Sequence, residues 1–227
     1  PHELEAVKAT TELLPEMMQF IEEKTAYKYP YPHYTQVVVQ DYPFPGLIGQ
    51  HRASIISDNY IDDYGVHKDF KYLWDGVAVQ ALTNQWFGNL SMPKSWDDIW
   101  LNKAFGQYFA GLFTIKDNSK TEYLSYYLPF EKNNALGNWN ANNKHPLVTQ
   151  NIKDPINLPN DNDNNYKGSL VLRMLQKEIG ESDWWNSVQL FVKSNVNKQI
   201  NTKDFQQAIE QTTGKSYQWF FDQWIYK

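Results

Sequence analysis

The residues whose types and spacing bear on chemistry are Gln80, Ala81, Asn84 and Lys103. Gln80 and Asn84 stand four positions apart in a stretch of helical apolar periodicity, so their side chains project from one face of the predicted helix. A histidine pair at this spacing can hold one Zn²⁺, and a glutamate beside the first histidine can take a proton from the metal-bound water. Carboxamide oxygens are feeble zinc ligands by comparison, and Ala81 has no group that can act as a general base.

The text that follows these positions is far more specific than the positions themselves. It reads NQWFGNL over residues 84–90 and WDDIWLN over residues 96–102. This text resembles the M1 family of zinc aminopeptidases, in which a His-Glu-x-x-His helix runs into Gln-Trp-Phe-Gly-Asn. In that family a Trp-Leu-Asn-Glu segment follows and supplies the third metal ligand after a gap of eighteen residues.

In the frame of this resemblance the family's two histidines fall on Gln80 and Asn84, and its glutamate falls on Ala81. Eighteen residues, 85 to 102, separate Asn84 from Lys103, which stands at the position of the ligand glutamate. A lysine ammonium is a cation placed where a dication should sit. The resemblance implies zinc as the family's cofactor, and the substitutions predict that this chain holds none.

Lys103 itself can take one of two arrangements. Its ammonium can occupy the space of the absent metal and donate to the side-chain oxygens of Gln80 and Asn84. Alternatively, its stem can pack on apolar surface while the ammonium extends to solvent. Both arrangements are incompatible with a metal held between the two amides.

A third family position lies near the predicted strands. Residues 46–49 read GLIG, and similarity to the family's Gly-x-Met-Glu-Asn segment places Ile48 where a glutamate binds the substrate's free amino terminus. An isoleucine cannot bind an ammonium group. The alternative is a plain Pro/Gly turn between two strands.

A fourth family position precedes a strongly apolar helix. Lys167-Gly168 resembles the family's Tyr-x-Lys-Gly helix start, which places Asn165 where a tyrosine stabilises the oxyanion of the tetrahedral intermediate. Tyr166 stands one residue later. Because successive residues at a helix start differ in direction by about 100°, we expect Tyr166 to point away from the site.

The elements that must position these residues follow from periodicity, turn residues and caps. We expect a short β-rich region near the N-terminus and a helical remainder. Residues 131–165 are rich in Asn and Pro and are predicted to form a long loop, within which His145-Pro146 is similar to a structural His-Pro of the family. Strands are predicted at 35–40 and 52–58. Helices are predicted at 2–24 with a bend or restart near Pro15, at 71–88, at 117–127, at 182–194, at 202–212 with Thr202 as cap, and at 216–226. A further helix opens at Trp96, contains Lys103 and has an apolar face that extends to Leu112.

The fold class expected is therefore α+β, mostly α, and the resemblance implies a thermolysin-like (gluzincin) catalytic domain. The resemblance covers nearly the whole chain, so residues 1–227 are expected to form one domain. Since Pro1 replaces a start methionine, the chain is expected to be a fragment or processed product of a longer protein.

Composition excludes several functional classes. The net charge is −5 and the pI is near 5.5, which argues against a nucleic-acid partner. The sequence has no apolar run of membrane-spanning length and no signal-peptide pattern. Cysteine is absent, so disulfides and thiolate metal sites are excluded, while the compartment stays open.

These substitutions predict a catalytically inactive M1-like domain, a pseudopeptidase that binds a peptide or protein or serves a structural role. One alternative is a metallo-aminopeptidase with a non-standard site, using dispersed groups such as His33, His51, His67 and His145 or the acids Asp97 and Asp98. The other is a spacer domain kept for its fold, which a contiguous exposed apolar patch would argue against.

Overall fold

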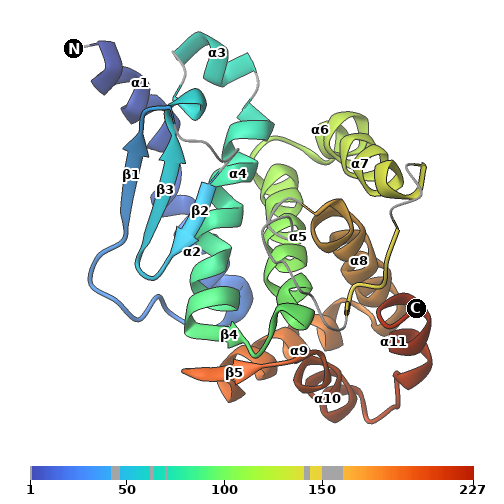
Figure 1. Ribbon diagram of the computed structural model, residues 1–227. Helices are drawn as coiled ribbons and strands as arrows, with labels where there is room; N and C mark the ends of the chain where they lie inside the picture. Colours follow the sequence, from blue (N-terminus) through green and yellow to red (C-terminus); the bar gives the residue numbers. More distant parts are fainter. Residues whose placement is uncertain (1, 42–46, 62–63, 70, 141–143, 150–160) are drawn as a thin grey trace.

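Helix α5 (Ile99–Asp117) lies at the centre of the computed structural model (Figure 1). The model describes residues 2–41, 47–61, 64–69, 71–140, 144–149 and 161–227. Most of the α5 side chains are buried, including Trp100, Phe105 and Phe109, which have no exposed surface. A helix that is apolar on nearly all sides must be covered on all sides. Helices α4 (Lys71–Asn84) and α8 (Gly168–Ile179) provide much of that cover.

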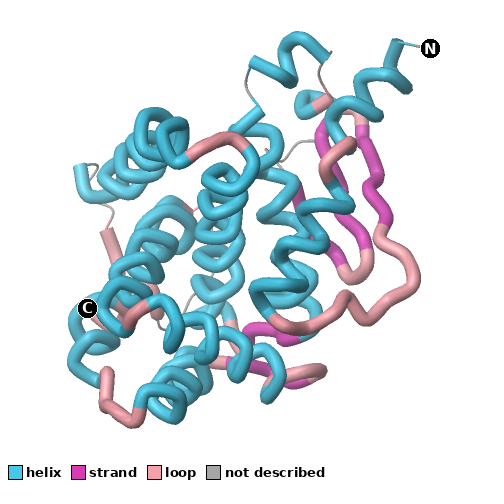
Figure 2. Tube along the Cα trace, turned by 180° about the vertical axis from the view of Figure 1, so that it is seen from behind, coloured by secondary structure: helices cyan, strands magenta, loops and turns pink. Residues whose placement is uncertain are grey.

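The other elements are arranged around this centre (Figures 1 and 2). The three-stranded sheet lies on one side of α4, and the C-terminal helices lie near the N-terminal end of α5. The remaining α-helices are α1 (His2–Thr11), α2 (Leu14–Thr25), α3 (Tyr64–Asp69), α6 (Lys120–Glu122), α7 (Leu128–Asn140), α9 (Glu181–Ser194), α10 (Thr202–Thr213) and α11 (Gln218–Trp224). The strands are β1 (Thr35–Val39), β2 (Leu47–Gln50), β3 (Ala53–Ser57), β4 (Ser91–Pro93) and β5 (Lys198–Ile200).

The larger sheet has the strand order β1-β3-β2. Strand β3 runs parallel to β1 and antiparallel to β2, and Ile48 of β2 pairs with Ile55 of β3. The turn between β2 and β3 is tied to the end of α4, because Gln85 Oε1 accepts a hydrogen bond from Arg52 N at 3.0 Å. The sheet is thereby fixed beside the helix that carries Gln80 and Asn84.

Two strands that are distant in sequence form a second, small sheet. Strand β4 pairs in parallel with β5, with Ser91 opposite Lys198. Ser91 Oγ also donates to Asn195 O at 2.9 Å. This sheet joins the segment after α4 to the C-terminal helices and closes the end of the core.

Aromatic rings fill the space between α5 and the C-terminal helices. The rings of Phe87 and Phe105 stack with centroids 4.1 Å apart, and Phe205 meets Phe105 edge-on at 5.3 Å. Trp184 and Phe191 continue the cluster. Such pairs add roughly 0.5–1.5 kcal/mol each beyond the burial of their area, so this aromatic cluster stabilises the contact between α5 and the C-terminal helices.

The fold is mostly helical with a few short strands, as predicted. The first helix restarts at Leu14 with Pro15 in its first turn, which confirms the expected break. The cap of α10 was predicted one residue late: Asn201 caps this helix, whereas Thr202 receives the indole N–H of Trp100 at 2.9 Å.

The long loop predicted over residues 131–165 is wrong in its first part, where α7 continues to Asn140. The physical reason is that α7 has almost no apolar stripe. Its fully buried side chain is the charged Glu131, which lies 3.6 Å from Arg173 Nε. Residues 141–143 and 150–160 lie outside the described residues.

In the described part of the chain, every helix is too short or too polar to cross a bilayer. This finding agrees with the absence of a membrane-length apolar run in the sequence.

Candidate functional site

Gln80 belongs to a hydrogen-bonded group between α4 and α5. Its Nε2 donates to Gln107 Oε1 at 2.8 Å. Gln107 Nε2 donates in turn to the hydroxyl of Tyr127 at 2.8 Å, and that hydroxyl donates to Gln107 O at 3.3 Å. Burial raises the pKa of Tyr127 well above its ordinary value, so the hydroxyl stays protonated and can donate. A neutral network therefore holds Gln80 in place.

Asn84 lies one turn after Gln80 on α4 and is bonded to a different residue of α5. Its Oδ1 accepts a hydrogen bond from Asn102 Nδ2. The backbone beside this pair must be glycine, because a Cβ on Gly88 would collide with the carboxamides of both Asn84 and Asn102. Gly88 lies in the π-helical turn Gln85–Leu90 that continues α4. The carboxamide oxygen of Asn84 is thus already engaged within the protein.

Lys103 lies on α5 between these two contacts and is half-buried. It makes no hydrogen bond or ion pair with a residue that the structure describes, so the expected donation to Gln80 and Asn84 is not observed. Burial lowers the pKa of its ammonium, because a charge is less stable away from water. The placement of Lys103 therefore matches neither expected arrangement fully. Its ammonium is partly removed from solvent and has no counter-charge among the described residues.

A cavity of about 340 Å³ opens beside Gln80. Gln80, Gln107 and Tyr127 form one wall, so the hydrogen-bonded network is also a surface that a ligand could touch. The remaining lining is mostly aromatic and comes from several elements: Tyr60, Trp74, Phe130 and Tyr166, with Gly76 and Val77. A concave, mainly apolar site with a few polar groups is typical of ligand-binding pockets.

The side chains of Asn165 and Tyr166 are not placed as expected: Tyr166 lines the cavity, and Asn165 bonds to the backbone. The amide of Asn165 donates to Asp161 O at 2.9 Å. Tyr166 lines the cavity with Gln80 and packs edge-on against Phe130 at 5.6 Å, so the expectation that it points away is wrong. Residues 163–167 form a π-helical turn, which has more residues per turn than an α-helix and changes the direction of each side chain.

The start of α8 packs closely on α5 just after this turn. A Cβ added to Gly168 would lie 2.7 Å from Ala104 Cβ, so a larger residue there would push α8 away. Ala104 follows Lys103 directly. Glycine at this position therefore keeps the π-helical turn close to the segment that carries Lys103.

Other predicted positions are placed as follows. Ile48 lies in β2, which packs beside α4, and not in a plain turn. Asp98 is committed to α10, because its Oδ1 accepts from both N and Oγ1 of Thr202 at 2.8 Å. His145 bonds Asp161 Oδ2 through Nε2 at 2.5 Å, and this hydrogen bond raises its pKa. Asp98 and His145 are thus held by structural contacts of their own.

Comparison with known proteins now decides the family. The model of the peptidase family M1 domain matches residues 9–224, nearly the whole chain.

The chain belongs to peptidase family M1.

Curated M1 relatives are distant in sequence. Tricorn protease-interacting factor F2 of Thermoplasma volcanium is 27% identical over 153 residues, 66% of this chain and 19% of that protein. Probable aminopeptidase 2 of Sulfurisphaera tokodaii is 20% identical over 229 residues, 100% of this chain and 29% of that protein. Human glutamyl aminopeptidase is 28% identical over 156 residues, 65% of this chain and 16% of that protein. The chain thus spans less than a third of these relatives.

A solved M1 structure has the same fold. A mutant M1 zinc metallopeptidase from Deinococcus radiodurans, bound to a Tyr-Ser-Ala substrate, superimposes with a TM-score of 0.72. The match covers 94% of this chain and 43% of that one, at 15% sequence identity. At this identity the likeness shows the fold alone.

The zinc that an M1 peptidase fold implies does not fit the residues between α4 and α5. The donors offered here are the carboxamides of Gln80 and Asn84, both engaged in hydrogen bonds, and the ammonium of Lys103. Zinc in proteins takes thiolate, imidazole or carboxylate ligands. Across the described residues, no group of three or more His, Asp or Glu side chains is arranged to hold a metal.

Three members of this site were not identified from the sequence: Asn102, Gln107 and Tyr127. Gln107 follows Lys103 by four residues and therefore shares its helix face, which is a signal that could have found it. Asn102 lies within the WLN text and was interpreted only as part of the family pattern. Tyr127 reaches the site from the π-helical turn Tyr123–Tyr127, and no sequence pattern indicates that contact.

Proposed function

We propose that this M1 domain lacks zinc-dependent aminopeptidase activity and binds a peptide or protein segment at the position of the M1 catalytic site. The observation that carries the proposal is the hydrogen bond from Gln80 to Gln107, together with that from Asn102 to Asn84. The side chains at the positions of the metal ligands are neutral amides, and they form hydrogen bonds with amides of α5. Lys103 adds a positive charge to the same place.

The loss of hydrolysis follows from the roles that are missing. Zinc in a peptidase polarises the substrate carbonyl and supplies the attacking hydroxide, and a nearby carboxylate manages the proton. Here Ala81 offers no base, and Asn165 is bonded to backbone Asp161 O. Removing one such group usually costs orders of magnitude in rate, so their joint substitution leaves no route to peptide hydrolysis by this mechanism.

A binding role is supported by the cavity that persists beside the substituted site. Its volume of about 340 Å³ lies within the range of small-ligand sites. Trp74 and Tyr166 line it, along with carboxamides that can bond a peptide backbone. An M1 domain that retains such a cavity can hold a short peptide without cleaving it.

The alternative, a metallo-aminopeptidase with a non-standard site, has less support. His145, Asp97 and Asp98 do not converge on the cavity; they are not among its lining residues. His67 lies 3.6 Å from the buried Asp75, but two residues provide too few ligands for a catalytic metal.

The test uses the tripeptide Tyr-Ser-Ala, which the Deinococcus radiodurans neighbour binds. We expect binding, detected by calorimetry, with no release of free tyrosine in the presence of Zn²⁺. The Trp74→Ala variant should weaken binding, whereas Trp219→Ala, an exposed tryptophan that does not line the cavity, should not. Release of tyrosine that a chelator abolishes would overturn the proposal.

A further inference from the structure

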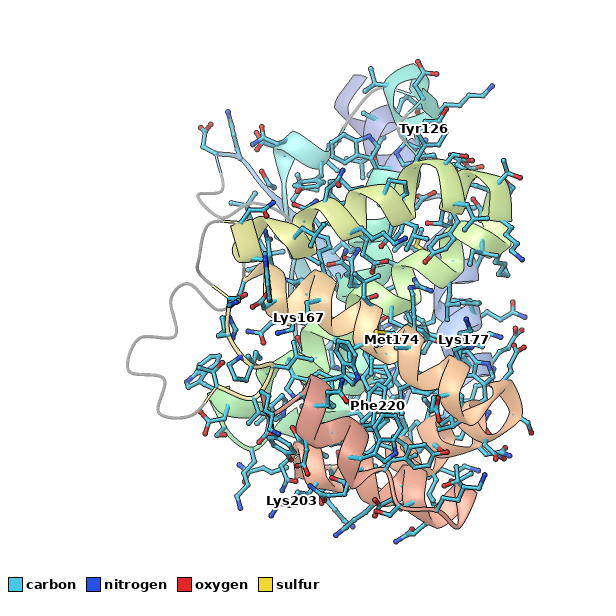
Figure 3. All side chains as sticks on the ribbon, turned by 90° about the vertical axis from the view of Figure 1, so that its right-hand side faces the viewer. Tyr126, Lys167, Met174, Lys177, Lys203 and Phe220 are labelled. Carbon is cyan, nitrogen blue, oxygen red and sulfur yellow. The ribbon has the colours of Figure 1, made fainter. Side chains whose placement is uncertain are left out.

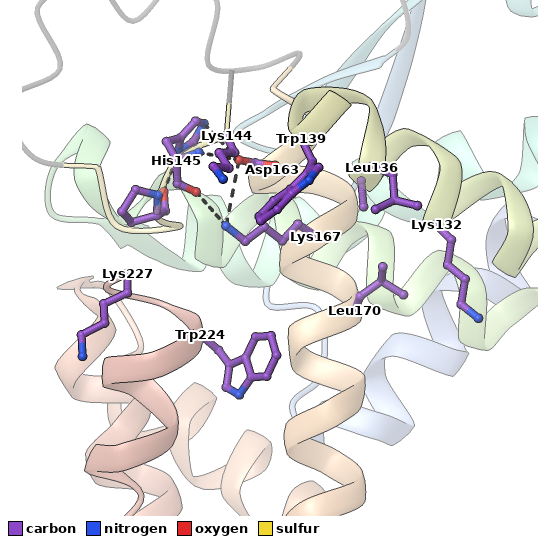
Figure 4. Close-up of a pocket in the computed structure, with 12 residues that line it drawn as sticks. Lys132, Leu136, Trp139, Lys144, His145, Asp163, Lys167, Leu170, Trp224 and Lys227 are labelled. Atoms are coloured by element: carbon purple, nitrogen blue, oxygen red, sulfur yellow. Dashed lines mark hydrogen bonds and ion pairs between the residues drawn. The ribbon is translucent and has the colours of Figure 1, made fainter. Parts of the chain in front are cut away.

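A second and larger cavity lies between α7, α8 and the end of α11 (Figure 4). Its volume is about 740 Å³, roughly twice that of the cavity beside Gln80. Among the residues that the structure describes, none lines both cavities. The role of this second cavity is therefore independent of the proposed function.

The floor and sides of this cavity are apolar. Figure 4 shows Trp224 on the α11 side and Leu136 and Trp139 on the α7 side, with Leu170 of α8 between them. Trp139 and Leu136 are 61% and 54% exposed, although burying a large apolar side chain stabilises a protein. Contiguous exposed apolar residues of this kind mark a binding surface.

The rim of the cavity is basic. Lys132, Lys144, Lys167 and Lys227 all line it, in a chain whose net charge is −5. In Figure 4, Lys132 and Lys227 lie on opposite sides of the cavity. A positive rim on a negatively charged protein is a local feature that favours an anionic ligand.

One of these lysines, Lys167, is already compensated by a neighbouring carboxylate. Lys167 Nζ donates to His145 O at 2.7 Å and lies 4.0 Å from Asp163 Oδ2. Asp163 is the carboxylate among the lining residues that the structure describes, and it also accepts from His145 N at 2.9 Å. Lys132 and Lys227 form no ion pair with the described part of the chain. Their charges remain available to a ligand.

The same contacts make the polar wall of the cavity rigid. His145 is held through its backbone by Asp163 and Lys167 (dashed lines in Figure 4) and through its ring by Asp161. Lys144 lies directly before it, and its ammonium sits over the Trp139 ring at 3.6 Å from the centroid. This cation–π contact joins the basic rim to the apolar wall. The cavity is thus preformed and does not need a ligand to create it.

We propose that this cavity, defined by Leu136, Trp139, Leu170, Trp224 and the rim lysines, binds a free amphipathic carboxylate of the medium-chain fatty acid class. The alkyl chain would lie against the two tryptophans and the two leucines. The carboxylate would lie at the rim near Lys132 or Lys227. Chain and head group match the separate apolar and basic parts of the site, and the cavity volume falls within the range of about 300–1,000 Å³ for small-molecule sites.

The probe is decanoate, titrated calorimetrically into the protein below its micelle concentration. Decyltrimethylammonium, which has the same chain and the opposite charge, is the comparison ligand. We expect saturable binding of decanoate, weaker binding of the cation by about 10-fold, and a loss of decanoate affinity when salt is raised, because salt screens the rim charges.

Variants separate the apolar and basic contributions. Trp139→Ala should weaken decanoate binding by about 10-fold through lost apolar contact. The double variant Lys132→Glu/Lys227→Glu should weaken it by about 5- to 10-fold through reversed rim charge. These side chains are exposed, so the fold should persist, and circular dichroism checks this.

Matched controls lie outside the cavity. Trp219→Ala removes an exposed tryptophan of α11, and Lys177→Glu reverses a charge at the end of α8 remote from Lys167 (Figure 3). Neither should change the affinity by more than about 2-fold. Trp74→Ala, in the cavity beside Gln80, should also leave decanoate binding unchanged, so failure of this proposal and failure of the peptide proposal can be told apart.

Three results would overturn the proposal: equal affinity for decanoate and decyltrimethylammonium, no saturable decanoate binding, or no effect of Trp139→Ala. Sedimentation with phosphatidylglycerol vesicles adds one more outcome. Vesicle binding that Lys132→Glu/Lys227→Glu abolishes, without binding of free decanoate, would mean that the site takes a lipid surface and not a free acid.

Discussion

The side-chain nitrogen of Gln80 on α4 lies 2.8 Å from the side-chain oxygen of Gln107 on α5 and donates a hydrogen bond to it. This contact joins the two helices at the place where an M1 peptidase is expected to hold its metal. The bond continues to the hydroxyl of Tyr127. Two amides and a phenol therefore bond with one another across the helix interface at this place.

The first prediction concerns Gln107. The Gln107→Leu variant should lose about 1–3 kcal/mol of unfolding free energy, because the half-buried side chain of Gln80 loses its acceptor and the buried hydroxyl of Tyr127 loses its side-chain donor. Urea denaturation measures this loss. The matched control is Gln207→Leu on the exposed face of α10, which should stay within about 0.5 kcal/mol of the parent protein. Equal effects of the two substitutions would show that the network contributes nothing.

The second prediction concerns Lys103. Because burial lowers the pKa of its ammonium below the ordinary 10.5, the unfolded chain binds the proton more tightly than the folded one. The contribution of Lys103 to stability should therefore rise with pH in the window just below 10.5. Lys103→Met removes the charge and should stabilise the domain by about 0.5–2 kcal/mol at neutral pH.

Urea denaturation of Lys103→Met at neutral pH and at pH ~9.5 tests the direction of this pH dependence. The gain should shrink at the higher pH. Lys177→Met, at an exposed position of α8, serves as control and should change little. Destabilisation by Lys103→Met at neutral pH would mean that the ammonium has a favourable partner in solution.

The third prediction concerns Asp75, a buried residue of α4. Burial raises its pKa to about 7, although the charge of Lys71 opposes the shift. The folded state therefore keeps a proton that the unfolded state has lost above about pH 4. Stability should fall as pH rises from about 4 to about 7, the window set by the unfolded and folded pKa values.

Asp75→Asn removes this titration and should be more stable than the parent at pH ~8 by about 1–3 kcal/mol. Thermal or urea unfolding at several pH values provides the comparison. Asn has nearly the same shape as Asp, so the packing against His67, 3.6 Å from Asp75, is kept in the variant. A parallel pH profile for the two proteins would refute the shift.

The fourth prediction concerns the ion pair under α7. Glu131 is fully buried and lies 3.6 Å from Arg173, whose guanidinium is also stacked between Tyr108 and Tyr123. Burial raises the pKa of Glu131, and Arg173 opposes that shift. Glu131→Ala should cost about 3–5 kcal/mol because it removes the carboxylate that compensates the mostly buried charge of Arg173.

Glu131→Gln should cost less than Glu131→Ala, because it keeps the volume and the hydrogen-bonding capacity. Chemical denaturation followed by far-ultraviolet circular dichroism measures both. An exposed acid on the neighbouring helix, Glu178, gives the control Glu178→Ala. If Glu131→Ala were as stable as that control, the pair would not support α7.

The sequence predicted the elements that have strong periodicity and missed those held by tertiary contacts. Helix α5 and the C-terminal helices could be predicted because their apolar positions recur at helical spacing. Helix α7 could not, since its buried member Glu131 is charged and its contact with Arg173 spans distant positions. The direction of Tyr166 was predicted with α-helical geometry, but the chain forms a π-helical turn there.

The candidate site shows the same division. Gln80, Asn84 and Lys103 could be placed together because the spacing of a known pattern was preserved around them. The partners of the two amides could not be predicted, because hydrogen bonds between α4 and α5 depend on how the helices approach each other. Gln107 and Asn102 became visible as partners in the folded structure.

The central claim, that this M1 domain holds no catalytic zinc, is tested most directly by metal analysis. The protein is equilibrated with buffered Zn²⁺, desalted and analysed by elemental spectrometry. A variant with Gln80→His, Ala81→Glu, Asn84→His and Lys103→Glu is treated in the same way. We predict no retained zinc in the parent protein and about one ion per chain in the variant, since imidazole and carboxylate ligands are restored. One tightly held zinc ion per chain in the parent protein would contradict the account.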